Sequence, residues 1–123
     1  MNMENIPPKV QNQLAMLQQM QQQLQTVVSQ KAQYELTIRE ARRAVEELGD
    51  VPEDAAVFMS VGGVMMQKGR EQVLTSLNER VETLELRVKS LDKQEKALQG
   101  RFEQLSSQIR GALEGKQQPP GAS

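Results

Sequence analysis

Apolar residues recur at alternating intervals of three and four positions in two long stretches of the chain. The first stretch has one polar member, Lys31, and comprises Leu17, Met20, Leu24, Val27, Lys31, Tyr34, Ile38, Ala41, Val45 and Leu48. The second has one polar member, Glu95, and comprises Leu74, Leu77, Val81, Leu84, Val88, Leu91, Glu95, Leu98, Phe102, Leu105, Ile109 and Ala112. A period of 3.5 residues held over this length is typical of a coiled coil. Because both stretches lie on one chain, the pattern predicts two long antiparallel helices that pack along an apolar seam.

Proline and glycine mark the expected ends of the two helices. The first helix should begin near Lys9, after two prolines, and end near Leu48, before Gly49 and Pro52. The second should begin near Arg70, after a glycine, and its periodicity persists to about Leu113. We therefore expect a flank at residues 1–8, a coiled-coil hairpin at 9–113 and a disordered tail at 114–123.

Between the helices, two short runs rich in valine and methionine surround Gly62 and Gly63. Such a glycine pair adopts the positive φ angles of a two-residue turn, so residues 56–68 are predicted to form a β-hairpin. A register set by this turn places one set of side chains on one face, namely Val57, Met59, Val61, Val64 and Met66. The other face then carries Phe58, Ser60, Met65 and Gln67.

Both faces of the predicted hairpin carry apolar groups, and the chain has no third strand to cover them. An isolated pair of strands is at best marginally stable in water, and its unpaired edges invite other strands. We infer that hairpins from several subunits complete one another, through Val57, Phe58, Met59, Val61, Val64, Met65 and Met66. The alternative is a small cap packed on the last helical turn, which the exposed positions of Phe58 and Met65 argue against.

Composition narrows the classes of function. The chain has 15 basic and 16 acidic residues, so bulk electrostatics do not favour a nucleic acid partner. It has no histidine and no cysteine, which removes the usual bases, thiol nucleophiles and metal ligands. Acidic residues near the end of the first helix, at 46–47 and 53–54, are expected to be solvated and not to bind metal. We therefore expect no enzyme, no cofactor and no membrane span, in a cytoplasmic protein.

The open end of the predicted coiled coil offers a second candidate surface. A two-helix coil buries only its inner seam, and its last turns fray, so apolar groups there should be accessible. This open-end surface comprises Val10, Leu14, Met16, Leu17, Ile109 and Leu113. Ordinary seam packing is the alternative, and it is favoured for Leu17 and Leu105 but less so for Met16 and Leu113. Methionine and leucine at a mobile end form an adaptable surface that binds many non-native chains weakly.

Local sequence marks along residues 5–115 resemble the archaeal prefoldin beta subunits. They are Pro8-Lys9-Val10-Gln11-Asn12-Gln13-Leu14, Ala44-Val45-Glu46-Glu47-Leu48, Val57-Phe58 through Gly62 to Val64, Leu84-Glu85-Leu86-Arg87 and Lys93-Gln94-Glu95. The single hairpin is similar to that of the beta class. One departure is Phe58, where the family often has tyrosine.

The resemblance implies a hexamer of two alpha-type and four beta-type subunits, in which the hairpins join into β-barrels. Such assemblies capture unfolded proteins at the coiled-coil ends without ATP and transfer them to a group II chaperonin. By position, the open-end surface would contact these client proteins. The alternative from another class is a structural coiled-coil scaffold, or oligomerisation module, that binds no client.

Overall fold

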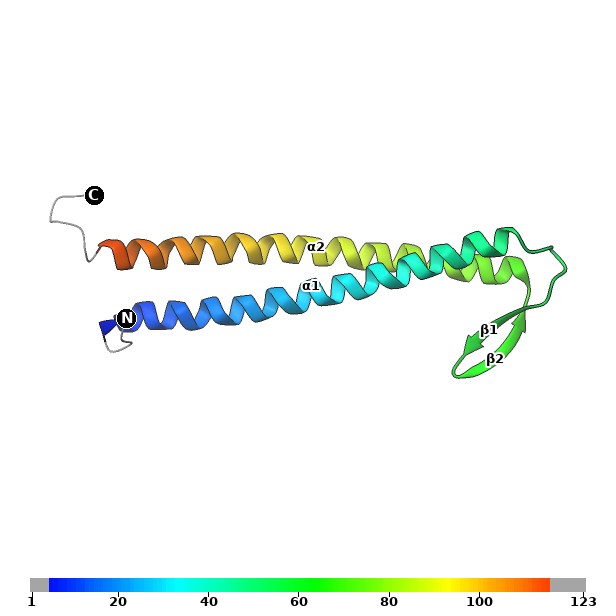
Figure 1. Ribbon diagram of the computed structural model, residues 1–123, viewed down its shortest axis with the longest axis horizontal. Coiled ribbons are helices and arrows are strands. Elements are labelled where there is room, and N and C mark those ends of the chain that lie inside the picture. Colours follow the sequence, from blue (N-terminus) through cyan, green and yellow to red (C-terminus); the bar gives the residue numbers. More distant parts are fainter. Residues whose placement is uncertain (1–4, 116–123) are drawn as a thin grey trace. The chain divides into compact units, whose positions relative to one another are not determined.

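The computed structural model describes residues 5–115 of the chain. Helix α1 spans Pro8–Gly49, strand β1 Val57–Val61, strand β2 Val64–Lys68 and helix α2 Arg70–Gly115 (Figure 1). The predicted fold of two long helices and one antiparallel hairpin is confirmed. Helix α2 extends to Gly115, so the first two residues of the expected tail are helical. The rest of that tail, and residues 1–4, lie outside the described residues.

Backbone chemistry explains where the helices begin. The amide of Gln11 donates to the carbonyl of Pro7 at 3.0 Å, and its side-chain Nε2 donates to the carbonyl of Ile6 at 2.8 Å. Proline suits this first turn because its missing N–H has no helical acceptor there. At the start of α2, the amide of Val73 donates to the carbonyl of Gly69 at 3.0 Å.

Contacts divide the chain into two compact units, and α1 and α2 both run through each. Of the described residues, 5–29 and 92–115 form the terminal unit, and 30–91 form the hairpin-bearing unit. The terminal unit has a buried cluster of Ile6, Val10, Leu105 and Ile109. Partly buried side chains pack against that cluster, namely Leu14, Leu17, Met20 and Leu113. Early residues of α1 therefore meet late residues of α2, as an antiparallel pair requires.

The hairpin-bearing unit is built around a second cluster of seam residues, Ile38, Ala41, Val81 and Leu84. Tyr34, Leu77 and Val88 pack around it. At its edge, Arg42 and Glu85 form an ion pair across the two helices, and the Arg87 guanidinium lies 5.8 Å from the centre of the Tyr34 ring. Within residues 5–115, no large side chain is less than 2% exposed. Two helices alone cannot enclose a side chain, so the stability is distributed along the seam.

The hairpin has the register that its glycine turn predicts. Val61 pairs with Val64, Met59 with Met66 and Val57 with Lys68. Gly62 and Gly63 have φ angles of 58° and 82°, which are both positive, as in a type I′ turn. Each turn position would strain a residue with a Cβ atom, which explains the use of two glycines. The two predicted sets of side chains therefore lie on opposite faces.

Two leucines in the first half of α2, one buried and one exposed, test the contribution of the seam. Leu84 is 7% exposed and Leu86 is 66% exposed. We expect Leu84→Ala to lower the free energy of unfolding by about 2 kcal/mol, at the low end for a buried leucine because the core is thin. Leu86→Ala should change it by less than about 0.5 kcal/mol. Urea unfolding followed by circular dichroism measures both, and equal effects would show that the seam does not stabilise the helices.

Candidate assembly and client-binding surfaces

The hairpin exposes large apolar side chains on both of its faces. On one face Phe58 is 55% exposed and Met65 is 65% exposed. On the other, Val64 is 61% exposed, and Val61 and Met66 are also exposed. The two remaining candidate assembly residues, Val57 and Met59, are half-buried. The unit's own helices therefore leave most of the hairpin's apolar surface uncovered.

Each strand of the hairpin has one hydrogen-bonded neighbour within the described residues, because the sheet has the order β1-β2. Each strand therefore presents a second, unpaired edge. Unpaired edges beside exposed apolar side chains are features by which sheets recruit strands from other chains. The hairpin thus has two features of an assembly surface, namely exposed apolar side chains on its faces and unpaired backbone groups along its edges.

A pocket of about 440 Å³ lies between β1 and the adjoining ends of the helices in the hairpin-bearing unit. Its lining is mostly apolar and consists of Ala44, Glu47, Leu48, Val51, Val57, Phe58, Met59, Ser60, Val73 and Leu77. We call this the β1 groove. β1 therefore lies beside the helix ends, but a space remains between them.

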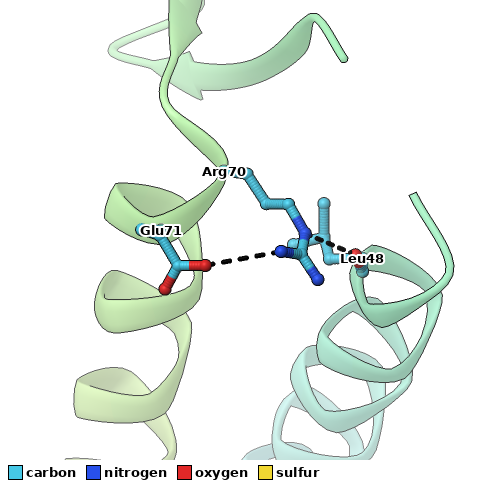
Figure 2. A network of polar contacts seen from close by, with 3 residues as sticks. All are labelled: Leu48, Arg70 and Glu71. Carbon is cyan, nitrogen blue, oxygen red and sulfur yellow. Dashed lines mark hydrogen bonds and ion pairs between the residues drawn. The ribbon is translucent and has the colours of Figure 1, made fainter. Parts of the chain in front are cut away.

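Arg70 links the end of α1 to the start of α2, at the base of the segment that carries the hairpin. Its Nε donates to the backbone carbonyl of Leu48 at 2.9 Å, and its Nη1 lies 3.4 Å from Oε1 of Glu71 (Figure 2). The arginine side chain is only 17% exposed. Because α1 has no basic residue in its own last turn, Arg70 supplies the cation that favours a helix C-terminus.

Sequence reasoning missed the role of Arg70. Its acceptor lies 22 residues earlier in the chain, on the other helix. The available signal was a helix end without a basic residue, followed by an arginine at the start of the next helix. That pattern indicates a possible cap and does not identify the acceptor.

The structure separates the members of the open-end surface by exposure. Val10 is 3% exposed and Ile109 is 6% exposed, so the expectation that these two are accessible is wrong. They pack together in the terminal unit because both occupy the inner seam. Leu14, Leu17 and Leu113 are half-buried, and Met16 is 50% exposed. A further residue, Ile6, joins the buried cluster.

The only sequence signal for the burial of Ile6 was an apolar residue just before the two prolines that start the helix. Ile6 precedes the helix, so helical periodicity did not include it. In the structure, Ile6 extends the buried cluster beyond the start of α1. The innermost contacts of the terminal unit thus include a residue outside the regular helix.

Residues 5–115 contain no group of three or more histidine, cysteine, aspartate or glutamate side chains placed to hold a metal ion. In the same part of the chain, neither helix combines the length and the apolar composition that a membrane span needs.

Comparison with known proteins identifies the family. The model of the prefoldin subunit family matches residues 11–116. The chain belongs to the prefoldin family. It is 92% identical to the prefoldin subunit beta of Methanoculleus marisnigri over 119 residues, which cover 97% of this chain and 98% of that relative. The resemblance to prefoldin beta subunits is thereby confirmed.

More distant prefoldin relatives agree. The chain is 41% identical to the prefoldin subunit beta of Thermococcus kodakarensis, over 98% of this chain and 99% of that one. The crystal structure of the prefoldin beta subunit from Thermococcus strain KS-1 is similar, with a TM-score of 0.82 at 41% identity. That match covers 96% of this chain and all of the other, so the helices and the hairpin together follow the prefoldin fold.

The contact between Arg70 and Leu48 can be tested by substitution. Arg70→Met keeps much of the side chain's apolar length and removes the charged donor, so the carbonyl of Leu48 loses this partner. We expect the free energy of unfolding to fall by about 1–2 kcal/mol. Arg80→Met, on an exposed arginine of the same helix, is the control and should change it by less than about 0.5 kcal/mol. Equal values for the two variants in urea unfolding would refute the role given to Arg70.

Proposed function

We propose that this chain is the beta-type subunit of an ATP-independent chaperone of the prefoldin family. In this proposal it assembles with an alpha-type subunit, as a hexamer of two alpha and four beta chains. The complex captures unfolded proteins at the distal ends of its coiled coils and transfers them to a group II chaperonin. The observation that carries the proposal is the exposed apolar hairpin, in a chain that belongs to this family.

Assembly through the hairpin is favoured by energetics. Phe58, Met65 and Val64 are each more than half exposed in the single chain. Full burial of such a side chain is worth about 1.5–3 kcal/mol, and each exposed one gains part of that when covered. An interface formed by several hairpins therefore gains stability from the groups that leave a lone hairpin marginal. The assembly surface in this proposal comprises Val57, Phe58, Met59, Val61, Val64, Met65 and Met66.

Client binding is proposed at the open-end surface, and the exposures rank its members. Met16 is exposed, and Leu14, Leu17 and Leu113 are half-buried, so these four are available without unfolding. Val10 and Ile109 contribute only when the terminal turns open locally. Such openings near helix ends cost little free energy compared with global unfolding. Weak contacts from several chains then add up, because linked sites bind one client together.

The second candidate function is a scaffold that oligomerises and holds no client. The burial of Val10 and Ile109 favours it, because a closed terminal unit offers less apolar surface than an open one. An aggregation-suppression assay with a denatured enzyme separates the two functions. The assay uses the complete complex with the alpha-type subunit, and normal aggregation in its presence leaves only the scaffold.

Phe58→Asp tests the assembly surface. A carboxylate placed where strands from several subunits meet costs on the order of 3 kcal/mol, which is more than about a hundredfold in assembly affinity. Helicity, measured by circular dichroism, should stay close to that of the native chain. Leu86→Asp replaces another exposed apolar residue of the same unit and should leave assembly unchanged. Light scattering after size-exclusion chromatography reports the mass, and a normal complex formed by Phe58→Asp would exclude the hairpin as the joint.

Met16→Ser combined with Leu113→Ser tests the client surface. We expect a loss of roughly 1 kcal/mol of apolar contact, or about fivefold in client affinity, with assembly intact. Leu36→Ser is the control, because Leu36 is 49% exposed and Met16 is 50% exposed. Titration of the complex against a denatured, fluorescently labelled enzyme measures the affinity. Equal client affinity for the double variant and the control would place client binding elsewhere.

A further inference from the structure

Gln13 is a polar residue in the apolar seam of the terminal unit. Steps of four and then three residues back from Leu17, which continue the spacing of the seam, lead to Gln13 and Val10. Val10 is buried and belongs to the cluster of the terminal unit, so the seam does extend this far. An apolar residue at position 13 would enlarge that cluster. The glutamine interrupts it instead.

The side-chain oxygen of Gln13, Oε1, is buried and has no hydrogen-bond partner. Within residues 5–115 no other buried side-chain nitrogen or oxygen lacks a partner. Lys31 and Glu95, the other two polar members of the seam, each have an interaction partner. A desolvated acceptor without a donor destabilises the state that buries it. The closed seam is therefore destabilised at Gln13, and opening relieves this because Oε1 can then accept a hydrogen bond.

The helix ends of the terminal unit also lack stabilising charges. The first turn of α1 has no acidic residue and carries Lys9, and the last turn of α2 has no basic residue and carries Glu114. Each charge has the same sign as the helix end that it occupies, which weakens the helix there. At their other ends the same helices have Glu71 in the first turn of α2 and the bond from Arg70 to Leu48. Local opening is therefore favoured in the terminal unit.

An open seam presents apolar side chains and a hydrogen-bond acceptor together. Val10 and Ile109, which are buried in the closed unit, become accessible along with Oε1 of Gln13. A segment of unfolded protein offers apolar side chains to the first two residues and backbone N–H groups to the third. Most backbone N–H groups of a folded protein are already paired, so a folded protein gains less from this site. The combination favours extended segments of unfolded chains.

We propose that Gln13 sets the affinity of this chain for unfolded clients by destabilising the closed seam. When the terminal turns open, Val10 and Ile109 contact apolar side chains of the client, and Oε1 of Gln13 accepts a hydrogen bond from its backbone. The apparent affinity then scales with the fraction of chains whose seam is open. This inference rests on the proposed client binding and deepens it, because it assigns the opening to one residue.

Gln13→Leu separates this role from simple apolar contact. Leucine removes the desolvated acceptor and enlarges the buried cluster, so the seam should open about tenfold less often. Client affinity should fall by about the same factor, because fewer chains are competent to bind. If clients bound through exposed apolar surface alone, the variant would keep its affinity or gain some. The two mechanisms therefore predict different results for one substitution.

Both quantities are measured on the complete complex with the alpha-type subunit. Hydrogen exchange followed by mass spectrometry reports the opening in peptides that cover residues 8–20 and 100–113. Titration against a denatured, fluorescently labelled enzyme reports client affinity. Gln18→Leu is the matched control, because Gln18 is an exposed glutamine of the same helix and unit. It adds the same side chain outside the seam and should neither slow exchange nor weaken binding.

Gln13→Glu provides a variant with the opposite effect on opening. It nearly keeps the shape of the side chain and still accepts hydrogen bonds, but an ionised carboxylate is costlier to bury than an amide. Exchange in the same peptides should be faster than in the native complex, and client affinity should be at least as high. A Gln13→Glu complex that opens more often but binds clients as weakly as Gln13→Leu would show that opening does not set the affinity.

Failure of the inference is distinguishable from failure of the proposed function. A Gln13→Leu complex that binds clients as tightly as the native complex overturns the inference and leaves the proposed function standing. Unchanged hydrogen exchange in that variant also overturns it, because the seam then opens independently of Gln13. If the native complex does not suppress aggregation of the denatured enzyme, the proposed function fails with the inference.

Discussion

A two-stranded hairpin has neither enough backbone partners nor enough apolar cover to be stable by itself, and this constraint organises the rest of the molecule. β1 and β2 bond only to each other among the described residues, and large apolar groups such as Phe58 and Met65 are more than half exposed. In other folds, a third strand or a packed helix removes such exposure. Here the adjoining helices leave a groove beside β1 instead. The hairpin is therefore well suited to join with strands from other chains, as its membership in the prefoldin family also favours.

Unlike the hairpin, the two helices bury their own apolar seam, although the core that they form is thin. Their seam buries residues such as Val10 and Leu84 to within a few per cent, yet no large side chain of the described residues is enclosed entirely. Stability in such a structure is a sum of many small terms, including the bond from Arg70 to the carbonyl of Leu48. A thin core also lets the terminal turns open at low cost. The thin core that limits stability also leaves apolar groups such as Met16 exposed.

Much of the fold was predictable because it follows from periodicity. The spacing of three and four predicted both helices and their seam, and Gly62 with Gly63 predicted the turn and the two faces of the hairpin. The accessibility of Val10 and Ile109 was predicted wrongly, because their seam positions keep both side chains buried even near the helix ends. Contacts of the helix ends with each other and with the hairpin left no periodic signal. The cap formed by Arg70 and the β1 groove both depend on how the helix ends and the hairpin meet in space.

The central claim is that the exposed hairpin joins this chain to other subunits. Native mass spectrometry of the chain, alone and mixed with a candidate alpha-type subunit, measures this most directly. The account predicts a discrete hetero-oligomer that contains both chains, with several copies of this one. A chain that stays monomeric in both samples, at concentrations where the family's complexes are intact, would contradict it.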